Sequence, residues 1–255
     1  MTDNLKAAEL LPLNEIYNED CLEGMRRIPD KSIDMILCDL PYGTTQNKWD
    51  SIIPLDKLWE QYTRIIKDDG AIVLTAQTPF DKVLGAANLK MLKYEWIWRK
   101  NKATGHLNAK KMPMKEHENV LVFYKKLPTY NAQGLIKKDV PTIRKGGSGN
   151  GTNYGKSDKD AIQEYGNYPK SCIEFPMDTG TFHPTQKPVA LFEYLIKTYT
   201  NEGETVLDNC MGSGTTAIAC MNTNRNFIGF ELDREYFEKA TQRIEAHTII
   251  REDIA

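Results

Sequence analysis

The chain has 255 residues, of which 40% are hydrophobic and 27% are charged, an ordinary balance for one globular domain with a sizeable core. The formal net charge is −2, so binding to nucleic acid would have to rest on a local basic patch rather than on overall charge. No apolar stretch is long enough to span a bilayer and the first residues lack a signal-peptide pattern, which predicts a cytoplasmic protein without a membrane partner.

Strand and helix patterns alternate along the first half of the chain. Short apolar runs bounded by turn residues predict strands, and apolar residues that recur near the helical period predict helices. These patterns predict, in chain order, a strand over 33–38, a helix over 54–67 that Gly70 follows as a stop signal, a strand over 71–75, a helix over 79–89, and strands over 93–99 and 118–124. Such alternation is typical of a mostly parallel α/β sheet.

Residues 128–182 interrupt this alternation, and they contain the glycine-rich run 146–151 with lysine and tyrosine residues around it. A long irregular stretch within a compact domain is usually functional or disordered. Beyond it the patterns predict a helix over 188–199, a strand over 205–207, a helix over 215–221, a strand over 226–230 and a helix over 235–246. We therefore expect one domain over residues 1–255, with an inserted region at 128–182.

The string Asp39-Leu40-Pro41-Tyr42 follows a predicted buried strand, and open α/β sheets bind ligands at the carboxyl ends of their strands. The exocyclic amino group of a nucleobase is a poor nucleophile, because its lone pair is delocalised into the ring. A carboxylate and a backbone carbonyl that accept its two N–H groups would localise that lone pair, and proline stiffens the turn. A tyrosine ring can stack on the base, worth about 1–3 kcal/mol. The alternative interpretation is a plain strand-ending turn.

A second string, residues 208–216, also follows a predicted strand. Its glycine turn, Gly212-Ser213-Gly214, lets the chain pass close to a ligand because no Cβ intrudes. The helix that follows points free N–H groups at a ligand carboxylate, and Asp208 can accept from a ligand ammonium. Glu231 lies about 20 residues beyond the turn, where an acidic residue binds ribose hydroxyls. The alternative interpretation is a tight turn without a ligand.

These strings resemble the D-P-P-Y and D-P-F-x-G-S-G-T-T motifs of amino-group DNA methyltransferases. Leu40 replaces the first proline of one motif, and Asn209 and Cys210 replace the Pro-Phe pair of the other. A third string, residues 183–188, matches the H-P-T-Q-K-P motif of the same family without a departure. The catalytic string precedes the cofactor string, which resembles the circularly permuted β-class order.

The resemblance implies a Rossmann-like sheet with helices on both faces, S-adenosylmethionine as cofactor, and residues 128–182 as the target-recognition region. It implies that a target adenine is flipped out of double-stranded DNA, because its amino group is unreachable in the stack. The expected catalytic residues are Asp39, Leu40, Pro41 and Tyr42. The expected cofactor-binding residues are Asp20, Cys38, Asp39, His183, Thr185, Gln186, Lys187, Asp208, Cys210, Gly212, Ser213, Gly214, Thr215, Thr216, Glu231 and Leu232.

Basic residues gather in a stretch after position 98 that has no acidic residue before Glu116. Its glycine and small alanine residues predict a mobile loop that clamps phosphates, which makes DNA affinity fall steeply with salt. The alternative is a solvated surface loop. The expected DNA-contacting residues are Arg99, Lys100, Lys102, Lys110 and Lys111 in this stretch, and Arg144 and Lys145 in the inserted region. We expect Arg144 to be able to read guanine bidentately.

Neither the cysteines nor the histidines predict a metal centre. The five cysteines are odd in number without C-x-x-C spacing, and the four histidines lie in no zinc pattern. The leading interpretation is an N6-adenine methyltransferase of the restriction-modification type. Cytosine-N4 methylation on the same fold stays open, although Asp39 favours adenine, and so does a catalytically silent DNA-binding protein. Methylation of RNA or of a protein amide is less favoured. The resemblance suggests a homodimer and leaves open a separate restriction nuclease and the target sequence.

Overall fold

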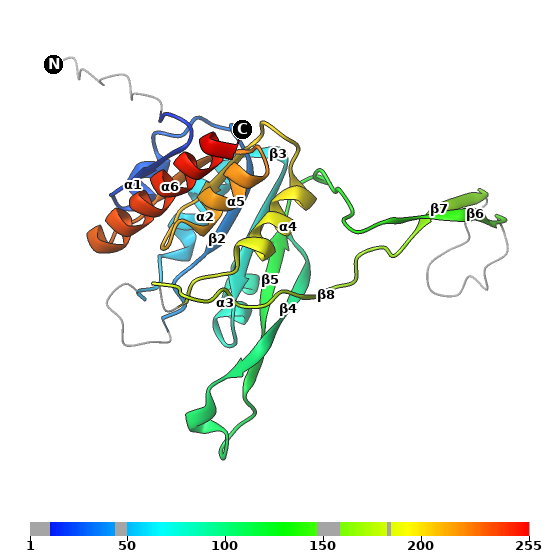
Figure 1. Ribbon diagram of the computed structural model, residues 1–255, viewed down its shortest axis with the longest axis horizontal. Coiled ribbons are helices and arrows are strands. Elements are labelled where there is room, and N and C mark those ends of the chain that lie inside the picture. Colours follow the sequence, from blue (N-terminus) through cyan, green and yellow to red (C-terminus); the bar gives the residue numbers. More distant parts are fainter. Residues whose placement is uncertain (1–10, 44–49, 147–158, 183–184, 255) are drawn as a thin grey trace. The chain divides into compact units, whose positions relative to one another are not determined.

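The computed structural model describes residues 11–43, 50–146, 159–182 and 185–254 (Figure 1). The chain forms two compact units. The first comprises Met1–Asn131 with Ser171–Ala255, and the second comprises Ala132–Lys170. The second unit lies inside the region 128–182 of the sequence prediction, while residues 171–182 belong to the first unit.

An eight-stranded sheet forms the centre of the first unit, in the order β1-β10-β9-β2-β3-β5-β4-β8. The strands in this order are Glu15–Tyr17, Asn226–Phe230, Thr205–Asp208, Ile33–Asp39, Ile66–Ala76, Lys115–Phe123, Leu92–Thr104 and Cys172–Glu174. The first five strands in this order, β1, β10, β9, β2 and β3, are all parallel to one another. Strand β5 is antiparallel to both its neighbours, and β8 is parallel to β4. The predicted mostly parallel α/β sheet is therefore confirmed.

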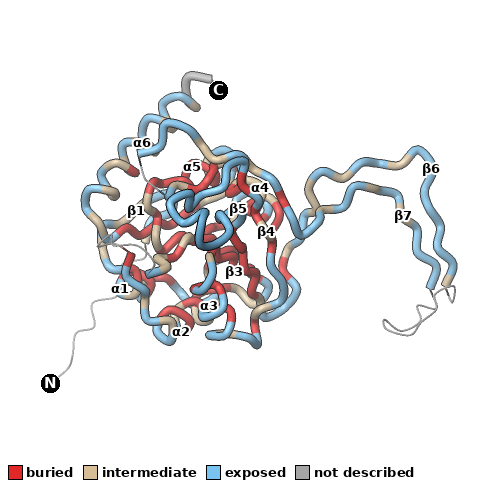
Figure 2. Tube along the Cα trace, turned by 90° about the horizontal axis from the view of Figure 1, so that it is seen from below, coloured by how far each residue is buried: buried red, intermediate tan, exposed pale blue. Residues whose placement is uncertain are grey.

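Helices cover both faces of this sheet, as the sequence resemblance implied (Figures 1 and 2). They are α1 Cys21–Met25, α2 Leu55–Ile65, α3 Phe80–Ala87, α4 Val189–Tyr199, α5 Thr215–Asn222 and α6 Arg234–Ile254. Successive residues of a strand point to opposite faces. Accordingly Ile36 and Cys38 of β2 join a core cluster with side chains of α2 and α3, while Met35 and Leu37 join a second cluster with side chains of α4 and α5.

The connection from α2 to β3 differs from the sequence prediction, which used Gly70 as a stop signal for a helix ending at residue 67. The helix ends at Ile65, β3 begins at Ile66, and Gly70 lies within the strand. A Cβ on Gly70 would stand 2.7 Å from the carbonyl oxygen of Asp34. Gly70 is therefore required by the close approach of β3 to β2, rather than by a helix end.

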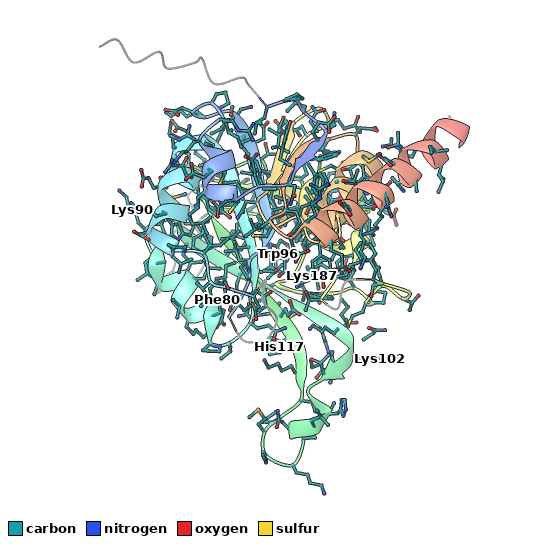
Figure 3. The ribbon with its side chains drawn as sticks, turned by 90° about the vertical axis from the view of Figure 1, so that its left-hand side faces the viewer. Phe80, Lys90, Trp96, Lys102, His117 and Lys187 are labelled. Atoms are coloured by element: carbon teal, nitrogen blue, oxygen red, sulfur yellow. The ribbon has the colours of Figure 1, made fainter. Side chains whose placement is uncertain are left out.

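The basic stretch predicted as a mobile loop is instead a hairpin, because β4 continues to Thr104 and β5 starts at Lys115. Arg99 pairs with His117 and Thr104 with Lys115, and a 3₁₀ turn, η1 His106–Asn108, lies between the strands. The hairpin extends from the sheet of the first unit (Figures 1 and 3). Its outer residues are exposed on both faces, so the sequence carries no apolar alternation there to mark the strands.

The second unit is a two-stranded antiparallel sheet of β6, Ile136–Arg144, and β7, Ala161–Gly166. Several large apolar side chains of this sheet are exposed, among them Ile136, Val140, Ile143 and Ile162. None of the helices in the described ranges has the length and apolar character that crossing a membrane requires.

Candidate active site

The two strings singled out in the sequence lie on adjacent strands of the sheet. Strand β2 ends at Asp39 and β9 ends at Asp208, and the two strands are parallel, with Met35 paired to Val206. The carboxyl ends of both strands therefore meet at one edge of the sheet, which is where ligands bind in open α/β folds. The structure thus brings the predicted catalytic and cofactor strings together.

Three side chains donate hydrogen bonds to the carboxylate of Asp39. The hydroxyl of Tyr42 donates to Oδ1 at 2.7 Å, and the hydroxyl of Thr75, the neighbour of Asp39 on β3, donates to the same oxygen. The ammonium of Lys187 donates to Oδ2 at 2.5 Å. A carboxylate has about four lone-pair positions. These three donors leave Asp39 with room for one further N–H donor.

Lys187 also belongs to a chain of buried charges. Its Nζ lies 3.3 Å from Oε2 of Glu118 on β5, and Oε1 of Glu118 lies 2.5 Å from Nζ of Lys100 on β4. Each of these three side chains is only 5% exposed. Burial by itself raises the pKa of Glu118, but Lys187 and Lys100 outweigh it and bring the pKa to about 2. Burial lowers the pKa of Lys187, yet Asp39 and Glu118 raise it above its ordinary value.

The ring of Tyr42 is packed rather than free. It stacks on Phe80 of α3 with ring centroids 5.5 Å apart, and the ammonium of Lys187 lies 5.7 Å from its centroid. Figure 3 shows Lys187 and Phe80 near the base of the hairpin that carries His117. Burial, together with the charges of Asp39 and Glu118, holds the pKa of the Tyr42 hydroxyl well above its ordinary value. The hydroxyl therefore stays neutral and donates to Asp39.

The carboxylate of Asp208 is nearly enclosed by the start of the cofactor string. It accepts hydrogen bonds from the amide of Cys210 at 3.0 Å and from the hydroxyl of Thr216, and Asp208 is only 3% exposed. Burial raises the pKa of Asp208 to about 6, because the hydrogen bonds from Thr216 and Cys210 only partly offset the loss of solvent. Asp208 is therefore an anion at neutral pH that is close to taking up a proton.

The glycine turn has the backbone that its sequence predicts. Gly212 has φ 52° and Gly214 has φ 78°, both in the left-handed region that favours glycine. The amide of Gly212 donates to Oε2 of Glu231 at 2.7 Å, and the amide of Asp233 donates to Oε1 at 2.8 Å. Glu231 therefore holds the turn against the end of β10, and lone pairs remain on both of its oxygens.

Helix α5 begins at this turn without a capping side chain. Gly214 is the N-cap and makes no side-chain hydrogen bond, so the first amides of the helix are left for another acceptor. Arg243 of α6 approaches from the other side, and its Nη1 donates to the carbonyl of Ser213 at 2.9 Å and to the hydroxyl of Thr215 at 3.2 Å. Nothing in the sequence marked Arg243, because its partner residues lie about 30 positions away, in the glycine turn and at the start of α5.

Arg243, which contacts this turn, also lines a cavity of about 530 Å³. Gln186, which the sequence predicted as a cofactor residue, lines this cavity. Asp178 lines it as well, although the sequence did not predict a role for either Asp178 or Arg243. Asp178 accepts from Val189 at the start of α4 and from the Gln186 amide, at 3.2 and 3.5 Å. The cavity is lined by Met177, Asp178, Thr179, Gly180, Thr181, Phe182, Gln186 and Arg243.

The other predicted cofactor residues have varied surroundings. Asp20 is the N-cap of α1 and accepts from the amides of Leu22 and Glu23, at 2.8 and 3.3 Å. The side-chain amide of Asn18, two residues earlier, donates to the backbone carbonyl of Glu231 at 2.9 Å, so this segment lies beside the end of β10. Cys38 is fully buried, Leu232 is 69% exposed and Thr185 is exposed. His183 lies outside the described residues.

Two predicted DNA contacts have different surroundings from those expected. Lys100 is buried against Glu118, so its ammonium faces the interior of the unit and not a phosphate. Arg99 is exposed but lies 2.9 Å from Glu116 and 3.3 Å from Glu174, which neutralise it. The exposed residues of the hairpin include Lys102, Lys110 and Lys111. Arg144 and Lys145 are exposed in the second unit.

Comparison with known proteins gives consistent matches over most of the chain. A family model, N6_N4_Mtase, described as "DNA methylase", matches residues 33–242. "DNA adenine methyltransferase YhdJ" from Escherichia coli (strain K12) is 28% identical over 249 residues, which cover 90% of this chain and 82% of that protein. "Type II methyltransferase M1.MboII" from Moraxella bovis is 28% identical over 253 residues, covering 91% and 96%. The crystal structure of the M1.HpyAVI-SAM complex is 25% identical, with a TM-score of 0.62, and covers 90% of this chain and 98% of that one.

Proposed function

The chain belongs to the DNA methylase family whose model it matches, and from this premise we propose that it methylates the N6 amino group of adenine in double-stranded DNA. The methyl donor is S-adenosylmethionine. The observation that carries this proposal is the carboxylate of Asp39, which keeps one lone-pair position for an amino hydrogen at the edge of the sheet beside the glycine turn. The name of the relative YhdJ supports adenine as the base.

The residues at the end of β9 fit S-adenosylmethionine. The methionine end of this cofactor carries a carboxylate, which suits the uncapped amides of α5, and an ammonium, which suits the buried anion Asp208. The remaining lone pairs of Glu231 suit the ribose hydroxyls. When bound, S-adenosylmethionine supplies an electrophilic methyl group.

The protein's own groups prepare the nucleophile. Asp39 accepts one hydrogen of the target amino group and the carbonyl of Leu40 accepts the other, which localises the lone pair on nitrogen. Alignment of the nitrogen with the methyl carbon supplies much of the rate. Once methylated, the nitrogen is cationic and loses a proton easily. Asp39 therefore needs to orient the amino group rather than to act as a strong base.

Tyr42 serves the target base through its ring, as the sequence predicted, and its hydroxyl also fixes Oδ1 of Asp39. Because the ring stacks on Phe80, the base that enters the site meets a ring already held in place. Pro41 lacks an amide hydrogen and fixes its own φ, which stiffens the turn between the two acting residues.

Contact with DNA is assigned to the hairpin and to the second unit. The exposed residues Lys102, Lys110 and Lys111 extend from the unit that carries Asp39, and they suit phosphates. Residues 128–182 serve target recognition, with Arg144 and Lys145 exposed there. A homodimer, the circularly permuted β-class order and a cytoplasmic location stay predictions, and a separate restriction nuclease stays open.

The reaction is tested by incubating the protein with S-adenosylmethionine labelled in its methyl group and unmethylated duplex DNA, followed by digestion to nucleosides. We expect labelled N6-methyladenine from the wild type and about 100-fold less or none from Asp39→Ala. Asp69→Ala, at an exposed carboxylate of β3, is the matched control. Labelled N4-methylcytosine would keep the mechanism and change the base. Transfer to none of several DNAs, with S-adenosylmethionine bound, would contradict the proposal and favour the silent DNA-binding protein.

A further inference from the structure

We propose that Glu118 and Lys100 are positioning residues, which act through Lys187 to hold the carboxylate of Asp39 in the one orientation that serves the target amino group. This inference rests on the proposed function. It assigns Lys187, expected from the sequence to contact the cofactor, to the catalytic carboxylate instead. It also assigns Lys100, expected to contact DNA, to the interior of the same site.

Four charged side chains form one line of alternating sign. Asp39 lies at the end of β2, Lys187 precedes α4, Glu118 belongs to β5 and Lys100 to β4. Successive charged atoms along this line are separated by 2.5, 3.3 and 2.5 Å. The two carboxylates and two ammonium groups balance, so the group is neutral as a whole.

A gain in the stability of the fold does not by itself explain why these four charged side chains are buried together. Removing charges from water costs several kcal/mol per ion, and well-packed apolar side chains of similar volume often replace a buried ion pair without loss of stability. Three of the four side chains are 5% exposed and carry this cost in full, while that of Asp39 is 22% exposed. Burial of this kind is justified where the position of a charge matters, as it does for a carboxylate that orients a nucleophile.

The contacts show how position is transmitted. Tyr42 and Thr75 hold Oδ1 of Asp39, so rotation of the carboxylate is limited by whatever holds Oδ2. That group is the ammonium of Lys187, which sits on a flexible four-carbon stem. A second acceptor is needed to keep this ammonium in one place, and Oε2 of Glu118 provides it.

Glu118 is in turn held by its other oxygen. Oε1 accepts from Lys100 and, at 2.8 Å, from the side-chain amide of Gln77. Without Lys100, the full charge of Glu118 would compete with Asp39 for Lys187. Without Glu118, Lys100 would lose the carboxylate it pairs with, and Lys187 would be held by Asp39 alone. Either change moves Lys187, and with it Oδ2 of Asp39.

The first test separates position from cofactor binding. In Glu118→Gln, we expect kcat to fall about 100-fold, the loss typical of a displaced catalytic group, while the Kd for S-adenosylmethionine measured by calorimetry changes less than about twofold. A Kd that rises in proportion to the fall in kcat would place Lys187 at the cofactor and overturn the proposal. Unchanged kcat would overturn it as well.

The second test separates position from folding. The double variant Glu118→Gln, Lys100→Met removes both outer charges and leaves the Asp39–Lys187 pair, so we expect thermal stability to recover while kcat stays low. Recovery of kcat together with stability would show a structural role only. Lys67→Met is the matched control, because Lys67 pairs with Asp34 at 2.5 Å at the start of β2, far along the strand from Asp39. It should lower Tm without changing kcat.

A third test needs no activity and therefore stands if the reaction assigned to the protein is wrong. The Tm changes of Asp39→Asn and Glu118→Gln should deviate from additivity by at least about 2 °C, because both carboxylates share Lys187. Additive changes in the wild-type background would overturn the proposal, whatever the substrate of the enzyme.

Discussion

The amide of Gly212 donates a hydrogen bond to Oε2 of Glu231 at 2.7 Å, which joins the glycine turn after β9 to the acidic residue after β10. Glu231, which we assign to the ribose of the cofactor, thus also sets the position of the glycine turn, which we assign to the methionine end of the cofactor. Burial raises the pKa of Glu231, although amide hydrogen bonds from Asp233 and Gly212 counter it. One side chain therefore links the two ends of the proposed cofactor site.

Glu231→Ala should weaken S-adenosylmethionine binding through both of these roles. We expect Kd to rise at least about tenfold, since the variant removes a charge-assisted hydrogen bond and the support of the turn together. At saturating cofactor kcat should change little, because Asp39 and its donors are untouched. Calorimetry gives Kd, and Glu235→Ala in the exposed first turn of α6 is the control. An unchanged Kd would contradict the assignment of Glu231.

Because of Asp208, the free energy of unfolding should rise as pH falls from about 6 towards 4. Its pKa is about 6 in the folded protein and 3.8 as a free group, so the folded state takes up a proton between about pH 4 and 6 that the unfolded state does not. The shift of 6 − 3.8, about 2 units, corresponds to about 3 kcal/mol of destabilisation above pH 6, which is relieved as pH falls towards 4.

Asp208→Asn should therefore be stabilised relative to the wild type at pH 7.5, and this advantage should shrink as pH is lowered through 6. Urea unfolding of both proteins at pH 4.5, 6 and 7.5 measures the difference, and its change with pH is the readout. Asp69→Asn, at an exposed carboxylate, is the control. A difference that stays constant with pH would show that Asp208 does not titrate in this range.

The hairpin should contribute to DNA affinity in proportion to its exposed charges. Replacing Lys102, Lys110 and Lys111 by Met should weaken binding and reduce the slope of log Kd against log salt by about 0.9 for each phosphate that is no longer neutralised. Lys100→Met is a matched control from the same stretch, because its ammonium is buried against Glu118. Fluorescence anisotropy with labelled duplex at several salt concentrations measures both. A slope that Lys100→Met changes as much as the triple variant would contradict the placement of these residues.

Gly70→Ala should destabilise the protein. The added Cβ would stand 2.7 Å from the carbonyl oxygen of Asp34, a backbone atom that cannot move aside cheaply, and we expect a loss of about 1–3 kcal/mol in the free energy of unfolding. Gly166→Ala is the control, because its nearest neighbour is a lysine side-chain carbon at 3.6 Å. Equal stability of the two variants in urea unfolding would show that β3 relaxes away from β2.

The sequence predicted the central sheet because its signals are local. A short apolar run ending in Asp39, and another ending in Asp208, mark two buried strands with the turns that follow them. Alternation of such strands with helices is enough to predict a mostly parallel sheet and to place both turns at one edge. The left-handed backbone of Gly212 and Gly214 follows from residue type in the same way.

The sequence did not predict the hairpin or the surroundings of its basic residues. Beyond Lys100 the two strands are exposed on both faces, so the alternation that marks a half-buried strand is missing. Arg99 and Lys100 are neighbours in a basic run, yet one is exposed and the other is buried, since successive strand residues point to opposite faces.

By itself, the sequence was enough to predict which residues carry the chemistry: the carboxylate and turn of Asp39 to Tyr42, the glycine turn and Glu231. Only the tertiary structure decided what holds them. Lys187 lies 148 positions from Asp39 in the chain, and Glu118 reaches it because β5 is antiparallel to β3, an arrangement that no local pattern encodes. Contacts between distant segments are set by the order and direction of strands in the sheet, whereas motifs and periodicity report only on neighbours along the chain.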